Sequence, residues 1–155
     1  MTELEHRIEH APEKYCIGVG KEMSLIHNRT HEIFKAFMPR KNEILTSNHD
    51  FVVDLKFYPK TYFEVFDPAK QFFKYAGVLV SKDSIVPDQM ELIVIPAGQY
   101  AVFQQHQKQD DRIFEYIFTE WLPKSKYQLD HRPHFDLIFT ATTPDEIWIP
   151  IKLKA

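Results

Sequence analysis

The stretch that decides the fold is residues 95–121, IPAGQYAVFQQHQKQDDRIFEYIFTEW. Pro96, Ala97 and Gly98 interrupt an apolar run and predict a tight turn. Residues 100–103 follow as a short apolar strand. After a polar loop, apolar residues recur every three or four positions, which is the spacing of one face of an amphipathic helix. The stretch therefore predicts a strand, a loop and a helix that packs on a sheet.

The predicted helix has recognisable ends. Asp110 or Asp111 can cap its start, because a carboxylate there accepts hydrogen bonds from free backbone N–H groups and suits the positive end of the helix. Pro123 is expected to stop it. Its apolar face consists of Ile113, Phe114, Ile117, Phe118, Trp121 and Leu122.

Length and composition indicate a single domain, residues 1–155, or two small similar halves that share a core. Aromatic residues make up 14% of the chain, more than a plain core needs, so some are expected to line a cavity. The net charge is −3 and no basic stripe stands out, which argues against nucleic acid as the partner. Cys16 is the one cysteine, so it excludes an internal disulfide and is expected to be buried.

The N-terminal residues do not look like a targeting segment. Residues 1–15 have no apolar core and alternate in charge, unlike a signal peptide. No apolar run approaches the roughly 20 residues that cross a bilayer. About a dozen residues precede the first strand, too few for a helix-turn-helix. We therefore expect a soluble cytoplasmic protein with neither a membrane partner nor a DNA-binding domain.

The rest of the chain adds a second helix and several strands. Asn28 or Thr30 can cap a helix whose apolar face consists of Ile33, Phe34, Phe37 and Met38. Strands are expected at residues 15–19, 51–58, 62–66, 72–80, 90–95, 134–140 and 146–153. In the strand at 51–58, Asp54, Lys56 and Tyr58 share a face that lies either at the surface or on the wall of a cleft.

These elements occur twice in the same order. Strand, helix, strand, strand is found in residues 14–66 and again in 91–152. The order predicts an α+β fold of two pseudo-symmetric β-α-β-β halves, approximately residues 14–80 and 88–153. Their strands would form one concave antiparallel sheet around a cleft, with both helices on the convex face.

The last predicted hairpin offers a pair of side chains suited to ligand chemistry. If the loop after residue 140 places Thr140 opposite Glu146, then Ile138 lies opposite Trp148, and Asp136 is a diagonal neighbour of Trp148 on the cleft face. Two apolar rows would then lie under the helix. These rows are Phe135, Leu137 and Phe139 on one strand and Ile147, Ile149 and Ile151 on the other.

A carboxylate beside an indole suits a flat or cationic ligand, because the ring supplies stacking and cation–π attraction and the carboxylate supplies a countercharge. The same carboxylate could act as a general acid or base if burial raises its pKa. The alternative is that Asp136 is a solvated strand residue and Trp148 half-covers a surface.

Metal and cofactor chemistry finds little support. His27 and His31 are four residues apart, a spacing typical of metal ligands on a helix. A cap at Asn28 or Thr30 would leave His27 outside the helix, so no metal site is expected. The sequence has no Gly-rich phosphate loop, nucleophile elbow or Cys/His cluster, and we expect no cofactor.

Six segments together resemble the GyrI-like family. They are residues 72–78 (FFKYAGV), 86–87 (VP), 95–103 (IPAGQYAVF), 121–127 (WLPKSKY), 133–136 (PHFD) and 147–152 (IWIPIK). That family includes the effector-binding domains attached to AraC- and MerR-type transcription regulators, gyrase-inhibiting proteins, and hydrolases of cyclopropane-bearing cytotoxins. The resemblance implies duplicated SHS2-like β-α-β-β modules around a pocket for small, often aromatic and often cationic molecules.

The resemblance also implies a set of site residues. Family members commonly carry a pocket glutamate at the position of Asp136, and aromatic residues usually wall the pocket. The candidate ligand-binding residues are therefore Asp136, Trp148, Tyr58, Phe103, Trp121 and Tyr62.

The leading hypothesis is a stand-alone bacterial small-molecule binding protein that senses or sequesters a drug or xenobiotic and passes the signal, if any, to a regulator protein. One alternative is a hydrolase with Asp136 as base and Tyr58 as hydrogen-bond donor. Aspartate is one methylene shorter than glutamate, which favours a countercharge over a positioned base. The other alternative is a module that binds a topoisomerase or a regulator.

Overall fold

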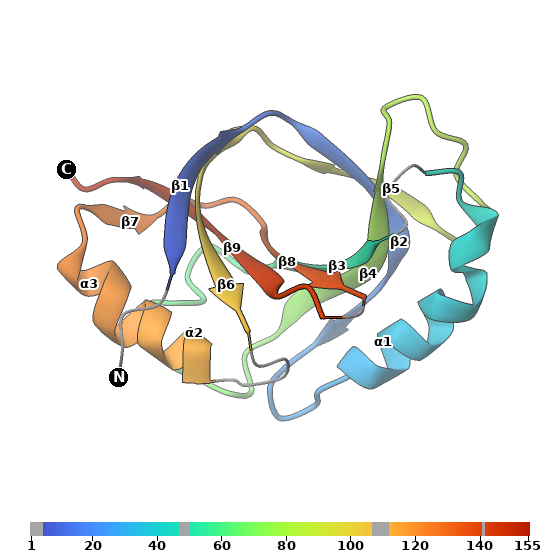
Figure 1. Cartoon of the computed structure of the whole chain (residues 1–155). Helices are drawn as coiled ribbons and strands as arrows, with labels where there is room; N and C mark the ends of the chain where they lie inside the picture. Colours follow the sequence, from blue (N-terminus) through green and yellow to red (C-terminus); the bar gives the residue numbers. More distant parts are fainter. Residues whose placement is uncertain (1–4, 47–49, 107–111, 141) are drawn as a thin grey trace.

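The computed structural model describes residues 5–46, 50–106, 112–140 and 142–155, and these residues form nine strands and two helical segments (Figure 1). The strands are β1 His6–Ala11, β2 Lys14–Met23, β3 Phe51–Phe57, β4 Phe72–Val80, β5 Glu91–Ile95, β6 Gly98–Gln105, β7 Tyr127–Leu129, β8 His134–Phe139 and β9 Asp145–Leu153. The first helical segment is α1 Thr30–Phe37 with a 3₁₀ turn Met38–Glu43. The second is α2 Arg112–Tyr116, a π-helical turn Ile117–Trp121 and α3 Leu122–Lys124.

The order of strands in the sheet confirms the predicted α+β fold with two β-α-β-β halves. Along the sheet the order is β1-β6-β9-β8-β3-β4-β2-β5, and β7 pairs with β9. The middle six strands are pseudo-symmetric about the β8–β3 pair. From this pair outward, β8, β9 and β6 of the second half correspond to β3, β4 and β2 of the first. The first unit is therefore β2, α1, β3 and β4, and it ends with β4 at residue 80.

The strand expected at residues 62–66 is wrong, because β3 pairs with β4 instead. The connection between them contains turns: the N–H of Tyr62 donates to the carbonyl of Pro59 at 2.9 Å. The rings of Tyr62 and Phe63 pack on Tyr58, with centroids 4.5 and 4.9 Å away. Aromatic packing on one point, rather than alternation across a sheet, explains why this apolar segment does not form a strand.

Two strands that the sequence analysis did not predict lie at the margins. β1 lies within residues 1–15, the N-terminal segment that alternates in charge. β7 lies between the second helix and the strand expected at residues 134–140. In β1, Ile8 packs against the apolar cluster under α2, while Arg7 and Glu9 remain partly exposed. A strand with a mostly polar sequence is tolerated at a sheet edge, because one side of its backbone can face water.

A long antiparallel ladder ties the two halves together. β1 and β2 follow one another across residues 12–13, and β5 and β6 follow one another across residues 96–97. Ala11 pairs with Gly98 and Lys14 pairs with Ile95, so both ladders keep one register through the break. The turn predicted at residues 96–98 is thus a bend in a long strand. Figure 1 shows both bent strands arching over one side of the central strands.

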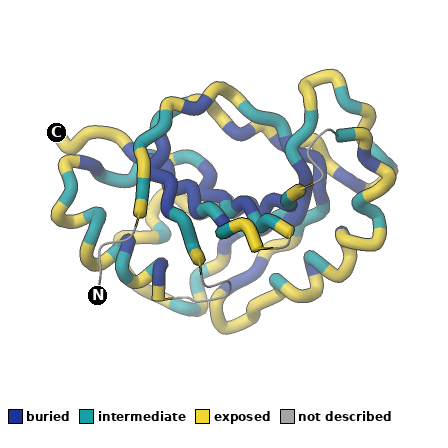
Figure 2. Tube along the Cα trace, viewed as in Figure 1, coloured by how far each residue is buried: buried dark blue, intermediate teal, exposed yellow. Residues whose placement is uncertain are grey.

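Apolar side chains gather in three clusters, one inside this arch and one under each helical segment. Figure 2 shows that buried residues follow the central strands of the sheet. Ile33 and Phe37 of α1 are buried on β2, β3 and β4. Ile113 and Ile117 are buried on β6 and β9, which confirms the predicted apolar face of the second helix. Cys16 is fully buried inside the arch, as expected.

The helix ends agree in part with the sequence analysis. The predicted cap at Asn28 or Thr30 is wrong, because Arg29 is the N-cap residue of α1 and no side chain caps the helix. The side-chain oxygen of Asn28 accepts a hydrogen bond from the N–H of Thr30 at 2.9 Å from a position outside the helix. The second helix ends one residue beyond Pro123. Its predicted cap at Asp110 or Asp111 lies outside the described residues.

Phe37→Ala should lower the free energy of unfolding by about 3–5 kcal/mol, because it removes a fully buried ring between α1 and the sheet. Urea unfolding followed by circular dichroism measures the loss. Leu45→Ala is the matched control, since Leu45 is 86% exposed and its truncation should change stability little. Equal losses in the two variants would contradict this packing.

Candidate functional site

The pairing of β8 with β9 decides which side chains share a face of the sheet. Phe135 lies opposite Trp148, and Asp136 lies opposite Ile147. The predicted pairing placed Ile138 opposite Trp148, so the predicted register of β8 on β9 is wrong by three residues. A shift by an odd number moves every side chain of a strand to the other face. Asp136 and Trp148 therefore lie on opposite faces, and they are not diagonal neighbours.

The connection between β8 and β9 accounts for the observed register. The carboxylate of Asp145 accepts a hydrogen bond from the N–H of Phe139 at 3.0 Å, so β9 begins one residue earlier than predicted. The rings of Phe135 and Trp148 then stack inside the arch, with centroids 5.1 Å apart and planes at 19°. The row of Phe135 and Leu137 consequently lies inside the arch rather than under the helix.

The isoleucine row of β9 behaves as the sequence predicted. Ile147, Ile149 and Ile151 are buried under the second helical segment. Asp136 is placed on this helix-facing side as well, because it pairs with Ile147. The helix-facing side of the central strands is thus where charged residues meet.

Four charged side chains form what we call the charge cluster: Asp54 and Lys56 on β3, Lys74 on β4 and Asp136 on β8. The Nζ of Lys56 donates to Oδ2 of Asp136 at 2.7 Å and lies 3.7 Å from Oδ1 of Asp54. The Nζ of Lys74 lies 3.3 Å from Oδ2 of Asp54. Their side chains are only 9–15% exposed. The cluster is therefore a buried, nearly neutral set of two acids and two bases.

Strand pairing brings the charge cluster together. Asp54 lies directly opposite Asp136 across β3 and β8, and Lys56 lies directly opposite Lys74 across β3 and β4. Both helical segments touch the cluster. Lys74 donates to the hydroxyl of Thr30 at the start of α1, at 2.9 Å. The ammonium of Lys56 lies 5.4 Å from the centre of the Phe114 ring in α2, within cation–π range.

Burial and neighbouring charges act in opposite directions on these groups. Burial lowers the pKa of Lys56, but the carboxylates of Asp136 and Asp54 outweigh it and raise the pKa above its usual value. Burial lowers the pKa of Lys74, and the carboxylate of Asp54 only partly offsets this. Burial raises the pKa of Asp136, as does the charge of Asp54, against the lowering effect of Lys56. Lys56 is therefore the fixed positive charge of the cluster.

Two oxygens of the charge cluster have no donor. Oδ1 of Asp54 and Oδ1 of Asp136 are buried, and no group in the described residues donates a hydrogen bond to either. Buried carboxylate oxygens are nearly always hydrogen-bonded, because leaving one unpaired has a cost in free energy. These two oxygens are thus available acceptors on the helix-facing side of the sheet.

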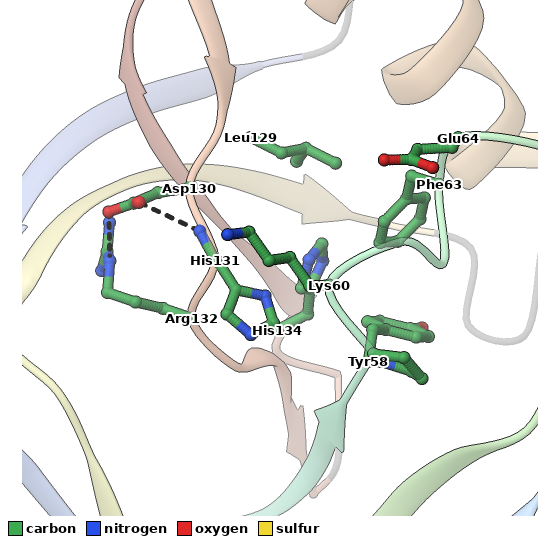
Figure 3. Close-up of a pocket in the computed structure, with 10 residues that line it drawn as sticks. Tyr58, Lys60, Phe63, Glu64, Leu129, Asp130, His131, Arg132 and His134 are labelled. Carbon is green, nitrogen blue, oxygen red and sulfur yellow. Dashed lines mark hydrogen bonds and ion pairs between the residues drawn. The ribbon is translucent and has the colours of Figure 1, made fainter.

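The structure has a groove with a volume of about 230 Å³ (Figure 3), and none of the residues that line it belongs to the charge cluster. Residues 58–60, 63 and 64 line one side of it, and residues 129–132 and 134 line the other. Figure 3 shows the Tyr58, Phe63 and His134 rings gathered at one end of the groove. We call this the aromatic groove.

The inner wall of the aromatic groove consists of stacked rings. The Phe63 ring stacks on His134 with centroids 5.3 Å apart, and it stacks on Phe118 of the π-helical turn at 5.2 Å. Tyr58 meets His134 edge to face at 4.9 Å, and Tyr62 lies against Tyr58. Phe63 is 43% exposed, so it is the outermost ring of this wall.

The rings of this wall lie between the groove and the charge cluster. Along the chain two of them are two residues away from members of the cluster. Two residues inward from Tyr58 is Lys56, and two residues inward from His134 is Asp136. Two residues of a strand span about 7 Å, and alternate residues face the same side. Burial, together with the positive charge of Lys56, lowers the pKa of His134 to about 3, so its imidazole is neutral at pH 7.

The structure brings together three of the six candidate residues from the sequence. Asp136, Tyr58 and Tyr62 lie on the helix-facing side, whereas Trp148 lies inside the arch. The other two candidates, Phe103 and Trp121, pack edge to face at 5.0 Å in the cluster under the second helix. The part that any of them plays in binding a ligand stays a prediction.

Sequence reasoning missed Lys74, His134 and Phe63 as members of this region. Lys74 stands alone in an apolar strand, FFKYAGV, and a single charge in a buried strand was a usable signal. His134 and Phe63 had no such signal. They are far apart in the sequence, and only the folded connection after β3 brings the Phe63 ring against His134 of β8.

Metal ligation and membrane crossing find no support in the structure. Within residues 5–46, 50–106, 112–140 and 142–155, no group of three or more His, Cys, Asp or Glu side chains could hold a metal ion. None of the helices in the same residues is long and apolar enough to span a membrane.

This chain has a GyrI-like effector-binding fold. A model of the Cass2 family, integron-associated effector binding proteins, matches residues 7–151. The chain therefore belongs to the Cass2 family. No curated protein matches it in sequence.

Solved structures share this fold at low sequence identity. SAV2435 bound to tetraphenylphosphonium has a TM-score of 0.66 at 12% identity, over 96% of this chain and 94% of that one. The integron cassette protein VCH_CASS2 of Vibrio cholerae has a TM-score of 0.61 at 10% identity, over 95% of each chain. The C-terminal domain of EcmrR has a TM-score of 0.61 at 13% identity, over 99% of this chain and all of that one. These identities show a common fold.

Lys56→Met should destabilise the protein by about 3–5 kcal/mol at pH 7, because it leaves Asp136 buried without its counterion. Urea unfolding of the variant and of the double variant Lys56→Met/Asp136→Leu measures the effect. The double variant should recover most of the loss, since it removes both charges. A double variant that is as unstable as Lys56→Met, or less stable, would contradict the coupling. Lys21→Met is the control, because its ion pair with Glu32 is exposed.

His134→Phe should flatten the dependence of stability on pH. The pKa of His134 is about 3 in the folded protein against 6.5 as its ordinary value, so its contribution is present above pH 6.5 and is lost as the pH falls toward 3. Within that window the wild type should lose about 1.4 kcal/mol per pH unit more than the variant. Urea unfolding at several values between pH 4 and 6 tests this. Identical slopes would show that His134 is protonated in the folded state.

Proposed function

We propose that this protein is a small-molecule binding protein that holds a flat aromatic ligand on the helix-facing side of its sheet. The observation that carries the proposal is the aromatic wall of Tyr58, Phe63 and His134, with the charge cluster directly behind it. A mostly apolar wall with a few convergent polar groups is typical of ligand sites. The effector-binding character of the Cass2 family and the ligand-bound state of SAV2435 support it.

Ligand entry would proceed by displacement of the Phe63 ring. This ring is held by ring contacts to His134 and Phe118, and its segment is a series of turns rather than a strand. Phe118 belongs to a π-helical turn, a feature that recurs at functional sites. A ligand ring that takes the place of Phe63 would stack on the same partners and reach the charge cluster.

The proposed role is the sensing or sequestration of a drug or other xenobiotic, with a regulator protein as the reader of the bound state. EcmrR, whose C-terminal domain shares this fold, is known in a complex with DNA, and this chain covers 58% of that EcmrR chain. Hydrolysis by Asp136 is the less favoured role, because aspartate reaches one methylene less far than the glutamate expected at this position, and a general base needs hydrogen-bond reach.

Tetraphenylphosphonium should bind the protein, and Phe63→Ala should strengthen that binding by about 1 kcal/mol, roughly fivefold in Kd, since the ligand then no longer has to displace a ring that stacks on His134 and Phe118. Isothermal titration calorimetry measures both affinities. Phe66→Ala is the matched control, because Phe66 lies in the same connection and is 81% exposed.

Equal affinities for the two phenylalanine variants, or weaker binding in Phe63→Ala than in Phe66→Ala, would place the ligand elsewhere on the molecule. Absence of binding for tetraphenylphosphonium and for uncharged aromatic probes alike would count against a small-molecule site.

A further inference from the structure

The charge cluster contains its own cations. Lys56 and Lys74 are paired with Asp136 and Asp54, so two negative charges already meet two positive charges. A ligand that brings only a positive charge gains little from a neutral cluster, and it must compete with ammonium groups held at 2.7 and 3.3 Å. Net charge is therefore a weak criterion for recognition at this site.

Two carboxylate oxygens of the cluster lack a hydrogen-bond donor, although the cluster contains two ammonium groups. Both lysines engage Oδ2 oxygens, and Oδ1 of Asp54 and Oδ1 of Asp136 accept no hydrogen bond from the described residues. The nearest ammonium to Oδ1 of Asp54 is that of Lys56 at 3.7 Å, which is too far for a hydrogen bond. The side chain of Asp54 is 9% exposed, so water reaches it poorly.

The two free acceptors belong to residues that face each other across two paired strands. Asp54 and Asp136 are direct partners in the β3–β8 ladder, so their Cβ atoms are about 5 Å apart. A planar group with N–H donors on two nitrogen atoms, such as an amidine or a guanidine, can donate to both carboxylates at once. A quaternary ammonium or phosphonium has no such donors and leaves both oxygens unpaired.

We propose that the ligand of this protein is an aromatic compound with a planar pair of N–H donors, which bind the Oδ1 atoms of Asp54 and Asp136 while the lysines stay in place. This inference rests on the proposed function and specifies its ligand class. The aromatic part takes the position of Phe63 between His134 and Phe118. The donor group then extends about 7 Å inward along β3 and β8 to the carboxylates.

Two probes with the same ring and the same charge isolate the donors. 2-Naphthamidine is a planar monocation with N–H donors on both nitrogens, and 2-naphthyltrimethylammonium is a monocation with none. Calorimetric titration of the full chain at pH 7 should give an amidine Kd at least about tenfold lower than that of the quaternary probe, because each hydrogen bond to a charged acceptor contributes. Equal Kd values, or a tighter quaternary probe, would overturn the inference.

Asp54→Asn and Asp136→Asn test the location of the donors. Either variant should reduce the preference for the amidine to about threefold or less, since asparagine keeps the shape but removes the charged acceptor. Glu115→Gln is the control, because it removes the same charge from an exposed position on α2 and should leave the preference unchanged. Retention of the full preference in both asparagine variants would overturn the inference.

The outcomes separate this inference from the function on which it rests. If both probes bind equally and Phe63→Ala strengthens the binding of both, the aromatic groove binds ligands and only the donor pair is wrong. If neither probe binds, the donor pair is wrong, and the proposed function fails with it only where tetraphenylphosphonium and uncharged aromatic probes do not bind either. The comparison of the two probes is made on the wild-type chain, so it decides the question even if an asparagine variant does not fold.

Discussion

The pairing of β3 with β8 is the interaction on which the rest of this structure depends. It joins the two halves of the sheet, and its register places Asp54 opposite Asp136 on a buried surface. Like charges directly opposite one another oppose strand pairing, and buried charges are costly unless they are paired. Lys56 and Lys74 offset this cost through ion pairs with both acids. The seam between the halves is therefore held by a charge cluster, with an unmatched acceptor on each side, rather than by apolar packing alone.

The arch explains why such a seam is tolerated. The strand that precedes each β-α-β-β unit pairs with the other unit, because β1 pairs with β6 and β5 pairs with β2. The halves are thus joined at two places, through the β3–β8 ladder and through the continuous ladder of the arch. The cluster inside the arch, with its stacked Phe135 and Trp148, adds apolar burial on the face opposite the charges. These contacts can supply the stability of the fold. The helix-facing side can therefore contain buried polar groups that destabilise the folded state.

The helices and most strands could be predicted from sequence because each depends on a local pattern. The face of Ile113 and Ile117 and the alternation of β3 are set by spacing alone. The register of β8 on β9 depends on a side-chain contact from Asp145 to Phe139, which spacing does not reveal, and an error of three residues moved Asp136 to the wrong face. The site was accordingly predicted in part. Asp136, Tyr58 and Tyr62 were identified as candidates. Their neighbours Lys74, His134 and Phe63 were not, because these residues come from β4, from β8 and from the connection between β3 and β4.

The composition of the helix-facing region sets the kind of selectivity it can have. A lone carboxylate in an apolar pocket favours cations of many shapes, because charge attraction has little directional preference. In this chain each carboxylate already has a lysine, and what is left unsatisfied is a pair of directional acceptors. A site whose buried acceptors need donors discriminates strongly against analogues that lack them, since those analogues leave the acceptors unpaired. Relatives at 10–13% identity share the fold, so the residues of this chain must supply the chemistry of recognition. If the proposed ligand binds here, the lysines of β3 and β4 change the criterion of recognition from the charge of a ligand to the geometry of its donors.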